Sequence, residues 1–176
     1  MKVGLFINTQ FPEGFNLAER IPEMVAQVRA ARDAGFASLW FPHHWLTHPM
    51  QMLQITPVMG YVAAHAQGMT IGPNILILPP LNPVHVAEEA ATLDVLTGGN
   101  YILGVGLGYR QPEFDAFGIS LKDRAPRFNE SITLMRRAVD RGPGQPQGPV
   151  LHRQRRRHQC EVSSTGWTAA LYRRAS

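Results

Sequence analysis

The chain has 176 residues, of which 44% are hydrophobic, enough for one globular domain with a sizeable core. The formal net charge of +4 is uneven: residues 1–140 hold ten basic and twelve acidic side chains, and residues 141–176 hold seven and one. Because the basic excess lies only in the C-terminal part, the composition argues against a nucleic-acid-binding surface on the rest. The single cysteine, Cys160, excludes an internal disulfide bond.

No apolar run approaches the ~20 residues that span a membrane. The N-terminus also lacks a cleavable signal pattern. These features predict a soluble, cytoplasmic protein with neither a membrane nor a nucleic acid as partner.

The first half of the chain alternates between strand and helix patterns. Residues 2–8, "KVGLFIN", form an apolar run typical of a strand. Residues 17–34 follow with helical spacing, and Pro22 suggests that the regular helix begins near Ile21. Gly35 ends this helix, and "SLWFP" predicts a second strand.

The pattern repeats twice more. Residues 54–68 predict a helix, and residues 69–80 predict a strand that is apolar on both faces, as in a buried parallel sheet. Residues 82–99 predict a helix with Asn82 as its N-cap. Residues 101–108 predict the fourth strand, and 127–139 the fourth helix.

Four strand–helix units without hairpin signals predict an α/β fold with parallel strands and right-handed crossovers. Two architectures fit this order: a doubly wound open sheet, or half of a (β/α)8 barrel. A complete barrel needs roughly 250 residues. In both architectures, ligands bind beyond the carboxyl ends of the strands.

Three histidines follow the second strand in "FPHHWLTH": His43, His44 and His48. The sequence around them offers no carboxylate or cysteine to complete a metal shell, so we expect no metal site. Adjacent side chains point in different directions, so one histidine in a ligand pocket is enough. The alternative is one packed imidazole and two solvated ones.

Asn74 is an isolated amide in the apolar third strand. It either makes a structural hydrogen bond inside the fold or contacts a polar heterocycle. In "GVGLG", the third glycine stands one position too early for a dinucleotide fingerprint, and Pro112 follows. These glycines are better explained as allowing another backbone or a flat ligand to approach closely.

Four ordered segments of residues 1–137 resemble the luciferase-like flavin monooxygenases: "AARDAGFASLWFPHHW", "IGPNILILPPLNPVHVAEEAATLDVLTGGN", "GVGLGYRQPEFDAFGI" and "RAPRFNESITLMRR". The resemblance implies a (β/α)8 TIM barrel, here with about four βα units. It also implies reduced FMN as cofactor, or the deazaflavin F420 in some branches. Such enzymes use reduced flavin and O2 to oxidise a small organic substrate, and a flavin reductase supplies the flavin.

The resemblance also assigns roles to residues. His43 matches the histidine near the flavin ring and is the catalytic candidate. The Asn74–Ile75 bond matches a non-proline cis peptide beneath the ring. Leu107 stands where luciferase has a phosphate-binding arginine, and Pro42 replaces the usual acid before the histidine pair. The residues expected to bind the cofactor are Asn74, Ile75, Gly106, Gly108 and Tyr109.

Residues 1–139 are therefore predicted to form the N-terminal half of such a barrel, and residues 140–176 an irregular tail outside the family. Back-translation of the tail with a shifted reading frame permits a family-like continuation, so we hypothesise a frameshift near Arg137–Ala138. A half barrel leaves unpaired strand edges, which predicts poor folding and weak flavin binding. The alternative function is a non-catalytic flavin-binding or dimerisation partner of an intact homologue, within a homo- or heterodimer.

Overall fold

A computed structural model describes residues 1–140, 158–162 and 168–173, and the side chains of residues 1–137. The central strands run parallel and follow the order of the chain. One sheet has the order β1-β3-β5, and β6 pairs in parallel with β7. An isolated parallel bridge between Ile71 and Tyr101 links the two sets. Their bounds are β1 Gly4–Phe6, β3 Ser38–Phe41, β5 Thr70–Pro73, β6 Leu76–Ile77 and β7 Leu103–Gly106.

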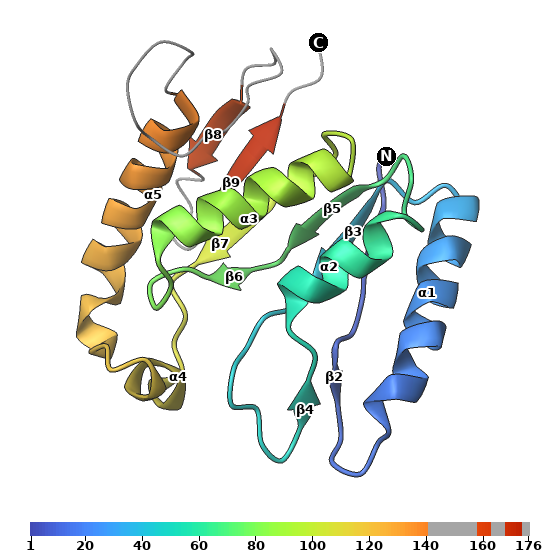
Figure 1. The fold of residues 1–176 in the computed structure, drawn as a ribbon, viewed down its shortest axis with the longest axis horizontal. Coiled ribbons are helices and arrows are strands. Elements are labelled where there is room, and N and C mark those ends of the chain that lie inside the picture. The colour runs from blue at the N-terminus through green and yellow to red at the C-terminus, as the bar shows by residue number, and fades with distance from the viewer. Residues whose placement is uncertain (141–157, 163–167, 174–176) are drawn as a thin grey trace.

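The long helices alternate with these strands and cover one of their faces, with α2 and α3 in front of the strands in Figure 1 and α1 and α5 to either side. Leu39 and Phe41 of β3 have no exposed surface and pack with Val28 of α1 and Met59 of α2 in one apolar core. This alternation confirms the predicted α/β class. The helices are α1 Leu17–Asp33, α2 Ile55–Ala63, α3 Pro83–Leu96 and α5 Arg124–Asp140.

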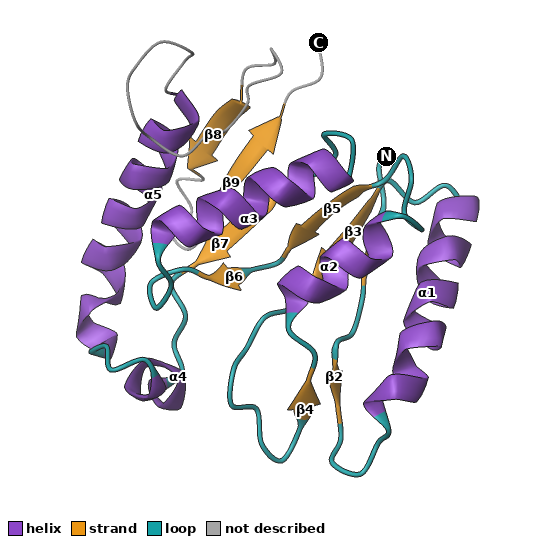
Figure 2. Cartoon of the chain, in the orientation of Figure 1, coloured by secondary structure: helices purple, strands orange, loops and turns teal. Residues whose placement is uncertain are grey.

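The four predicted strands do run parallel, but the structure adds antiparallel pairings that the sequence did not predict. Strands β2 (Gln10–Phe11) and β4 (Gln51–Met52) pair antiparallel, where the loops after β1 and β3 come together (Figure 2). Strands β8 (His158–Val162) and β9 (Thr168–Arg173) also pair antiparallel, and β9 does so with β7. A strand of two residues has no readable hydrophobic period, so the pattern gave no signal for β2 and β4.

The predicted tail, residues 140–176, is described only in part. The structure gives the backbone of β8 and β9, and the remaining residues after Asp140 lie outside the described ranges. The irregular structure predicted for the tail and its origin in a frameshift stay predictions. Within the described ranges, no helix is long and apolar enough to cross a bilayer.

The predicted third strand, residues 69–80, is divided into β5 and β6 by Asn74 and Ile75. The Asn74–Ile75 peptide bond is cis, as the resemblance implies. On the β5 side, the Asn74 amide donates to Phe41 O (2.8 Å), and on the β6 side the Leu78 amide donates to Gly106 O (3.1 Å). The division therefore moves the chain from pairing with β3 to pairing with β7.

Helix α1 begins at Leu17, before the start near Ile21 that Pro22 suggests. The Asn16 side chain accepts a hydrogen bond from the Ala18 amide (3.1 Å) and caps the helix there. A cap satisfies amides that the first turn leaves without partners, so the helix extends N-terminally past the proline.

Asn82 caps α3 as predicted. Its Oδ1 accepts from the amides of Val84 (2.9 Å) and His85 (3.5 Å). We expect Asn82→Ala to lower the free energy of unfolding by about 1 kcal/mol, because these amides lose their acceptor. The matched variant Asn82→Asp keeps the acceptor and should leave stability nearly unchanged. Urea denaturation followed by circular dichroism measures both, and equal losses would contradict the cap.

Candidate functional site

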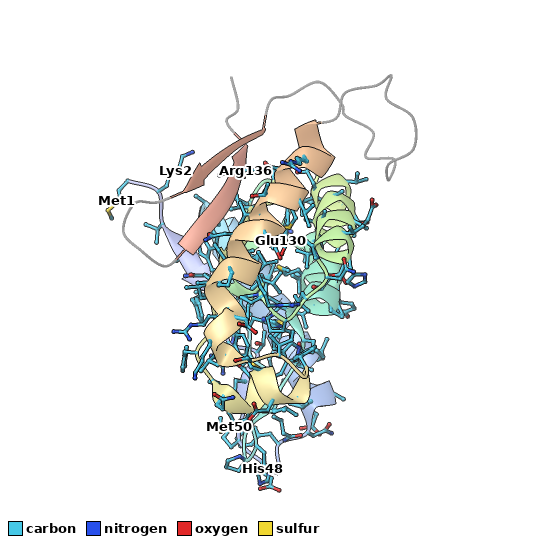
Figure 3. All side chains as sticks on the ribbon, turned by 90° about the vertical axis from the view of Figure 1, so that its left-hand side faces the viewer. Met1, Lys2, His48, Met50, Glu130 and Arg136 are labelled. Atoms are coloured by element: carbon cyan, nitrogen blue, oxygen red, sulfur yellow. The ribbon has the colours of Figure 1, made fainter. Side chains whose placement is uncertain are left out.

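The loops that follow β1, β3 and β7 gather at one end of the molecule. In Figure 1, β2, β4 and α4 (Gln111–Ala116) lie at the lower end, away from the N-terminus. Figure 3 shows His48 and Met50 at this end and Met1 and Lys2 toward the other. The parallel strands carry the chain toward this end, so it is where a ligand is expected.

His43 is buried, with 5% of its surface exposed. Its Nδ1 accepts a hydrogen bond from the Ile77 amide (3.1 Å), so a neutral ring carries its proton on Nε2. Burial lowers the pKa of His43 from 6.5 to about 4; a hydrogen bond with Gln54 and the charge of Glu113 partly offset this, and His44 adds to it. At neutral pH the ring is therefore uncharged. Its catalytic role stays a prediction.

His44 points to a different partner, the carboxylate of Glu113. His44 Nδ1 and the Trp45 amide each lie 2.9 Å from Glu113 Oε1. Arg110 Nη1 lies 3.2 Å from the same oxygen and also donates to Trp45 O (2.7 Å), and Nη2 donates to Leu46 O (3.1 Å). Glu113 has no exposed surface. The loop after β3 is thus fastened to α4 through a buried carboxylate and its neighbouring guanidinium.

The three histidines separate by environment. His43 is buried, His44 is partly buried against Glu113, and His48 is exposed at the tip of the loop. Adjacent residues do point in different directions, as expected, and only His43 is enclosed by the fold. No cluster of three metal-ligating side chains occurs in the described part of the chain.

Asn74 is exposed, and its side chain has no hydrogen-bond partner among the described residues. Of the two alternatives for Asn74, a structural hydrogen bond inside the fold is therefore not observed, because the break between β5 and β6 leaves the amide at the surface. Ile75 is half-buried and packs toward Gly106: a Cβ atom on Gly106 would lie 2.5 Å from Ile75 Cδ1.

The glycines of β7 and its exit make room for protein side chains. A Cβ atom on Gly108 would lie 2.6 Å from Ile77 Cγ2 and 3.1 Å from Phe114 Cε2, and the φ angle of +70° also favours glycine there. Tyr109 is 71% exposed, and its ring meets His44 edge-to-face at 5.8 Å. The predicted contacts of Gly106, Gly108 and Tyr109 with a cofactor stay predictions.

The aromatic residues of the second strand and its loop divide between two faces. Phe41 lies in the core, so it does not line a ligand slot. Trp40 is only partly buried, on the opposite face, where its ring covers Gly72 and its Nε1 donates to Ser38 Oγ (3.0 Å). Trp45 packs edge-to-face on His43 at 4.1 Å and on Phe117 at 4.8 Å.

Comparison with known proteins decides the family. Residues 1–165 match the luciferase-like monooxygenases. The chain belongs to this family. The match includes the predicted barrel half, residues 1–139, and continues into the predicted tail.

Among curated relatives, the chain is 30% identical over 122 residues to the uncharacterized protein y4vJ of Sinorhizobium fredii, covering 67% of this chain and 34% of the relative. It is 24% identical over 142 residues to the alkanal monooxygenase alpha chain of Photorhabdus luminescens, covering 81% and 39%. The chain thus spans between a third and two fifths of the length of these relatives.

Solved structures share the fold at low identity. Monooxygenase RslO1 from Streptomyces bottropensis superposes with a TM-score of 0.71 at 22% identity, over 84% of this chain and 46% of that one. The oxygenating constituent of 3,6-diketocamphane monooxygenase from Pseudomonas putida, in complex with FMN, gives 0.69 at 20% identity, over 85% and 42%. An F420-dependent secondary alcohol dehydrogenase gives 0.66 at 24%, over 84% and 45%. Family members therefore bind FMN or F420.

Glu113 and Arg110 both lie within the family-like segment "GVGLGYRQPEFDAFGI", but the sequence alone predicts no role for either residue. Two signals indicate their pairing: opposite charges three residues apart, and a carboxylate at the start of a helix. The link to His44, 69 positions away, depends on the tertiary structure. Arg110 is already engaged with two carbonyl oxygens and Glu113, which makes it a loop-holding residue here.

Proposed function

We propose that this chain supplies the flavin-binding part of a luciferase-like monooxygenase that uses reduced flavin and O2 to oxidise a small organic substrate. The observation that carries the proposal is the meeting of three segments at the carboxyl ends of the strands. Ile77 bonds to His43, and Ile75 packs on Gly106, so the loop after β3, the β5–β6 break and β7 are in direct contact.

The described residues fit a flat polar heterocycle. Asn74 presents an amide without a partner among the described residues, next to the half-buried Ile75, and Trp45 packs on the neighbouring His43. Such a surface combines apolar contact with one orienting polar group, as small-molecule sites commonly do. A bound reduced flavin would supply the electrons that O2 accepts in the oxidation.

The residues around this position would hold the ring and shelter it from water. His43, neutral at pH 7, presents an uncharged imidazole, and its Nδ1 fixes the Ile77 backbone next to the β5–β6 break. We propose Asn74, Ile75, Gly106, Gly108 and Tyr109 as the flavin contacts and His43 as the catalytic candidate.

FMN is the proposed cofactor and F420 the alternative. Titration of each into the chain, followed by cofactor fluorescence, decides between them: saturable quenching by FMN alone is expected. A response to F420 alone would replace FMN in the proposal, and a response to neither would reject flavin binding.

A single substitution tests the orienting amide. Asn74→Leu should weaken FMN binding about tenfold, since losing one polar contact amounts to ~1.4 kcal/mol. The matched variant Asn129→Leu, on an exposed face of α5, should leave the affinity unchanged. Equal affinities of the two variants would remove Asn74 from the site.

A second candidate function is a non-catalytic partner that binds another copy or an intact homologue. Tyr61 of α2 and Val95 and Leu96 of α3 support it, because these apolar side chains are 57%, 80% and 57% exposed. Sedimentation velocity of the chain alone and with an intact homologue tests it. A concentration-independent monomer in both cases would reject it. A flavin reductase is the partner proposed for the enzymatic function.

A further inference from the structure

The carboxylate of Glu113 is enclosed by the protein yet makes all its contacts through one oxygen. Oε1 meets His44 Nδ1, the Trp45 amide and Arg110 Nη1, whereas Oε2 is buried without a partner among the described residues. Burying a carboxylate costs several kcal/mol unless charged or polar partners compensate. An apolar side chain at position 113 would fill the same space without this cost in folding free energy. The buried carboxylate therefore points to a role in holding its three partners in place.

Glu113 and Arg110 together hold the backbone of Trp45, one at its amide and the other at its carbonyl oxygen. Glu113 accepts from the Trp45 amide, and Arg110 donates to Trp45 O (2.7 Å) and onward to Leu46 O (3.1 Å). Leu46 has a positive φ of 49°, which an L-residue rarely adopts without such support. The pair therefore fixes the turn of the loop directly after His44.

This fixed turn determines where the Trp45 ring lies. The ring packs edge-to-face on His43 at 4.1 Å and also meets Phe117, just beyond α4, at 4.8 Å. If the Trp45 backbone moved, the indole would leave His43, and the side of the imidazole that it covers would be open to water.

Apolar packing of α4 is supplied by a different residue. Phe114 has no exposed surface and contacts the position of Gly108. The helix would therefore remain seated without a carboxylate at position 113. The two neighbouring residues therefore have different roles: Phe114 packs α4 against the strands, and Glu113 attaches the loop after β3 to α4.

We propose that Glu113 is a positioning residue, which holds Trp45 and His44 in place beside His43 through its buried carboxylate. The inference deepens the proposed flavin site and rests on it, since the positioned residues surround the proposed ring position. The proposed role concerns the conformation of the loop after β3, and this conformation can be measured without catalytic turnover.

The test uses the full chain labelled with 5-fluorotryptophan, whose Trp45 signal in 19F NMR is assigned by Trp45→Phe. Glu113→Gln keeps the size of the side chain and one acceptor oxygen but removes the charge. We expect it to shift or broaden the Trp45 resonance, to change the 15N shifts of the His44 ring, and to weaken FMN binding about tenfold. Far-UV circular dichroism should remain that of the wild type.

Three further variants make the result decisive. Asp115→Asn, exposed on the same helix, should change none of these signals. Phe114→Leu should lower the melting temperature while leaving the His44 ring signals in place. If Glu113→Gln fails to fold, Arg110→Lys replaces it in the test. Lysine lacks the guanidinium that donates to two carbonyl oxygens, so this variant should produce the same Trp45 shift.

An unchanged Trp45 resonance in a folded Glu113→Gln chain would overturn the inference. An unchanged FMN affinity in a chain whose Trp45 resonance has moved would also overturn it, because the loop would then not serve the site. Failure of the wild-type chain to bind FMN would reject the proposed function instead, and the Trp45 and His44 signals would then decide the positioning role alone.

Discussion

Gly72→Ala is expected to unfold the chain or to lower its free energy of unfolding by more than about 3 kcal/mol. Gly72 is buried in β5, and a Cβ atom there would overlap the carbonyl oxygen of Ile102 and press on the Trp40 ring. A flexible side chain could move aside, but a backbone carbonyl beside a parallel bridge cannot move without separating the strands. Overpacking of a core typically costs 1–3 kcal/mol, and a backbone clash exceeds that range.

A second glycine provides the matched control. Gly60 lies in the middle of α2, and its nearest neighbour to an added Cβ is Leu96 Cδ1 at 4.0 Å, an ordinary contact. Gly60→Ala should be neutral or stabilise the chain by roughly 0.5–1 kcal/mol, since alanine favours the helix. Urea denaturation followed by far-UV circular dichroism measures both variants. A Gly72→Ala chain as stable as Gly60→Ala would contradict the close approach of β5 to the residues before β7.

Acidification between pH 6.5 and 4 is expected to destabilise the chain through His43. Burial holds the pKa of this residue at about 4 in the folded chain, whereas the unfolded chain has the ordinary value of 6.5. Between pH 6.5 and 4 the imidazole of His43 therefore binds a proton in the unfolded state but stays neutral in the folded state. The contribution of the neutral imidazole to the free energy of unfolding is fully present above pH 6.5. As the pH falls below 6.5, this contribution decreases by about 1.4 kcal/mol per pH unit, and by about 3 kcal/mol in all at pH 4.

His43→Gln should remove most of this slope, because glutamine can still accept from the Ile77 amide but does not titrate. The exposed His48→Gln serves as the control and should retain the wild-type slope. Unfolding free energies at pH 7, 5.5 and 4.5 give the comparison. If the slopes of the two variants agree, the acid sensitivity arises elsewhere and His43 is not held neutral by burial.

The α/β order was predictable because its signals are local. The apolar runs of the strands, the N-cap of Asn82 and the exposed faces of the helices repeat over many residues, and each predicts its element without reference to the rest. The division of residues 69–80 into β5 and β6 was not readable as a boundary, since the run from Ile75 to Leu78 is continuously apolar.

The candidate site was predictable only in part. The resemblance placed His43 and the Asn74–Ile75 bond, and the structure brings their segments together. The contacts of Glu113 could not be read from the sequence, because they join residues 68 and 69 positions apart through loops with no periodic pattern. A loop's conformation depends on which distant partners the strands bring to it.

The most direct test of the account is a titration of FMN into the 15N-labelled chain, followed residue by residue by NMR. We expect saturable shifts of the amides of residues 43–46, 74–77 and 106–109, at the carboxyl ends of β3, β5 and β7. The amide signals of Met69 and Gly98, two residues that line a hollow beside the amino end of β5 and the carboxyl end of α3, should stay unchanged. Shifts confined to that hollow, or none at any concentration, would contradict a flavin site at the carboxyl ends of the strands.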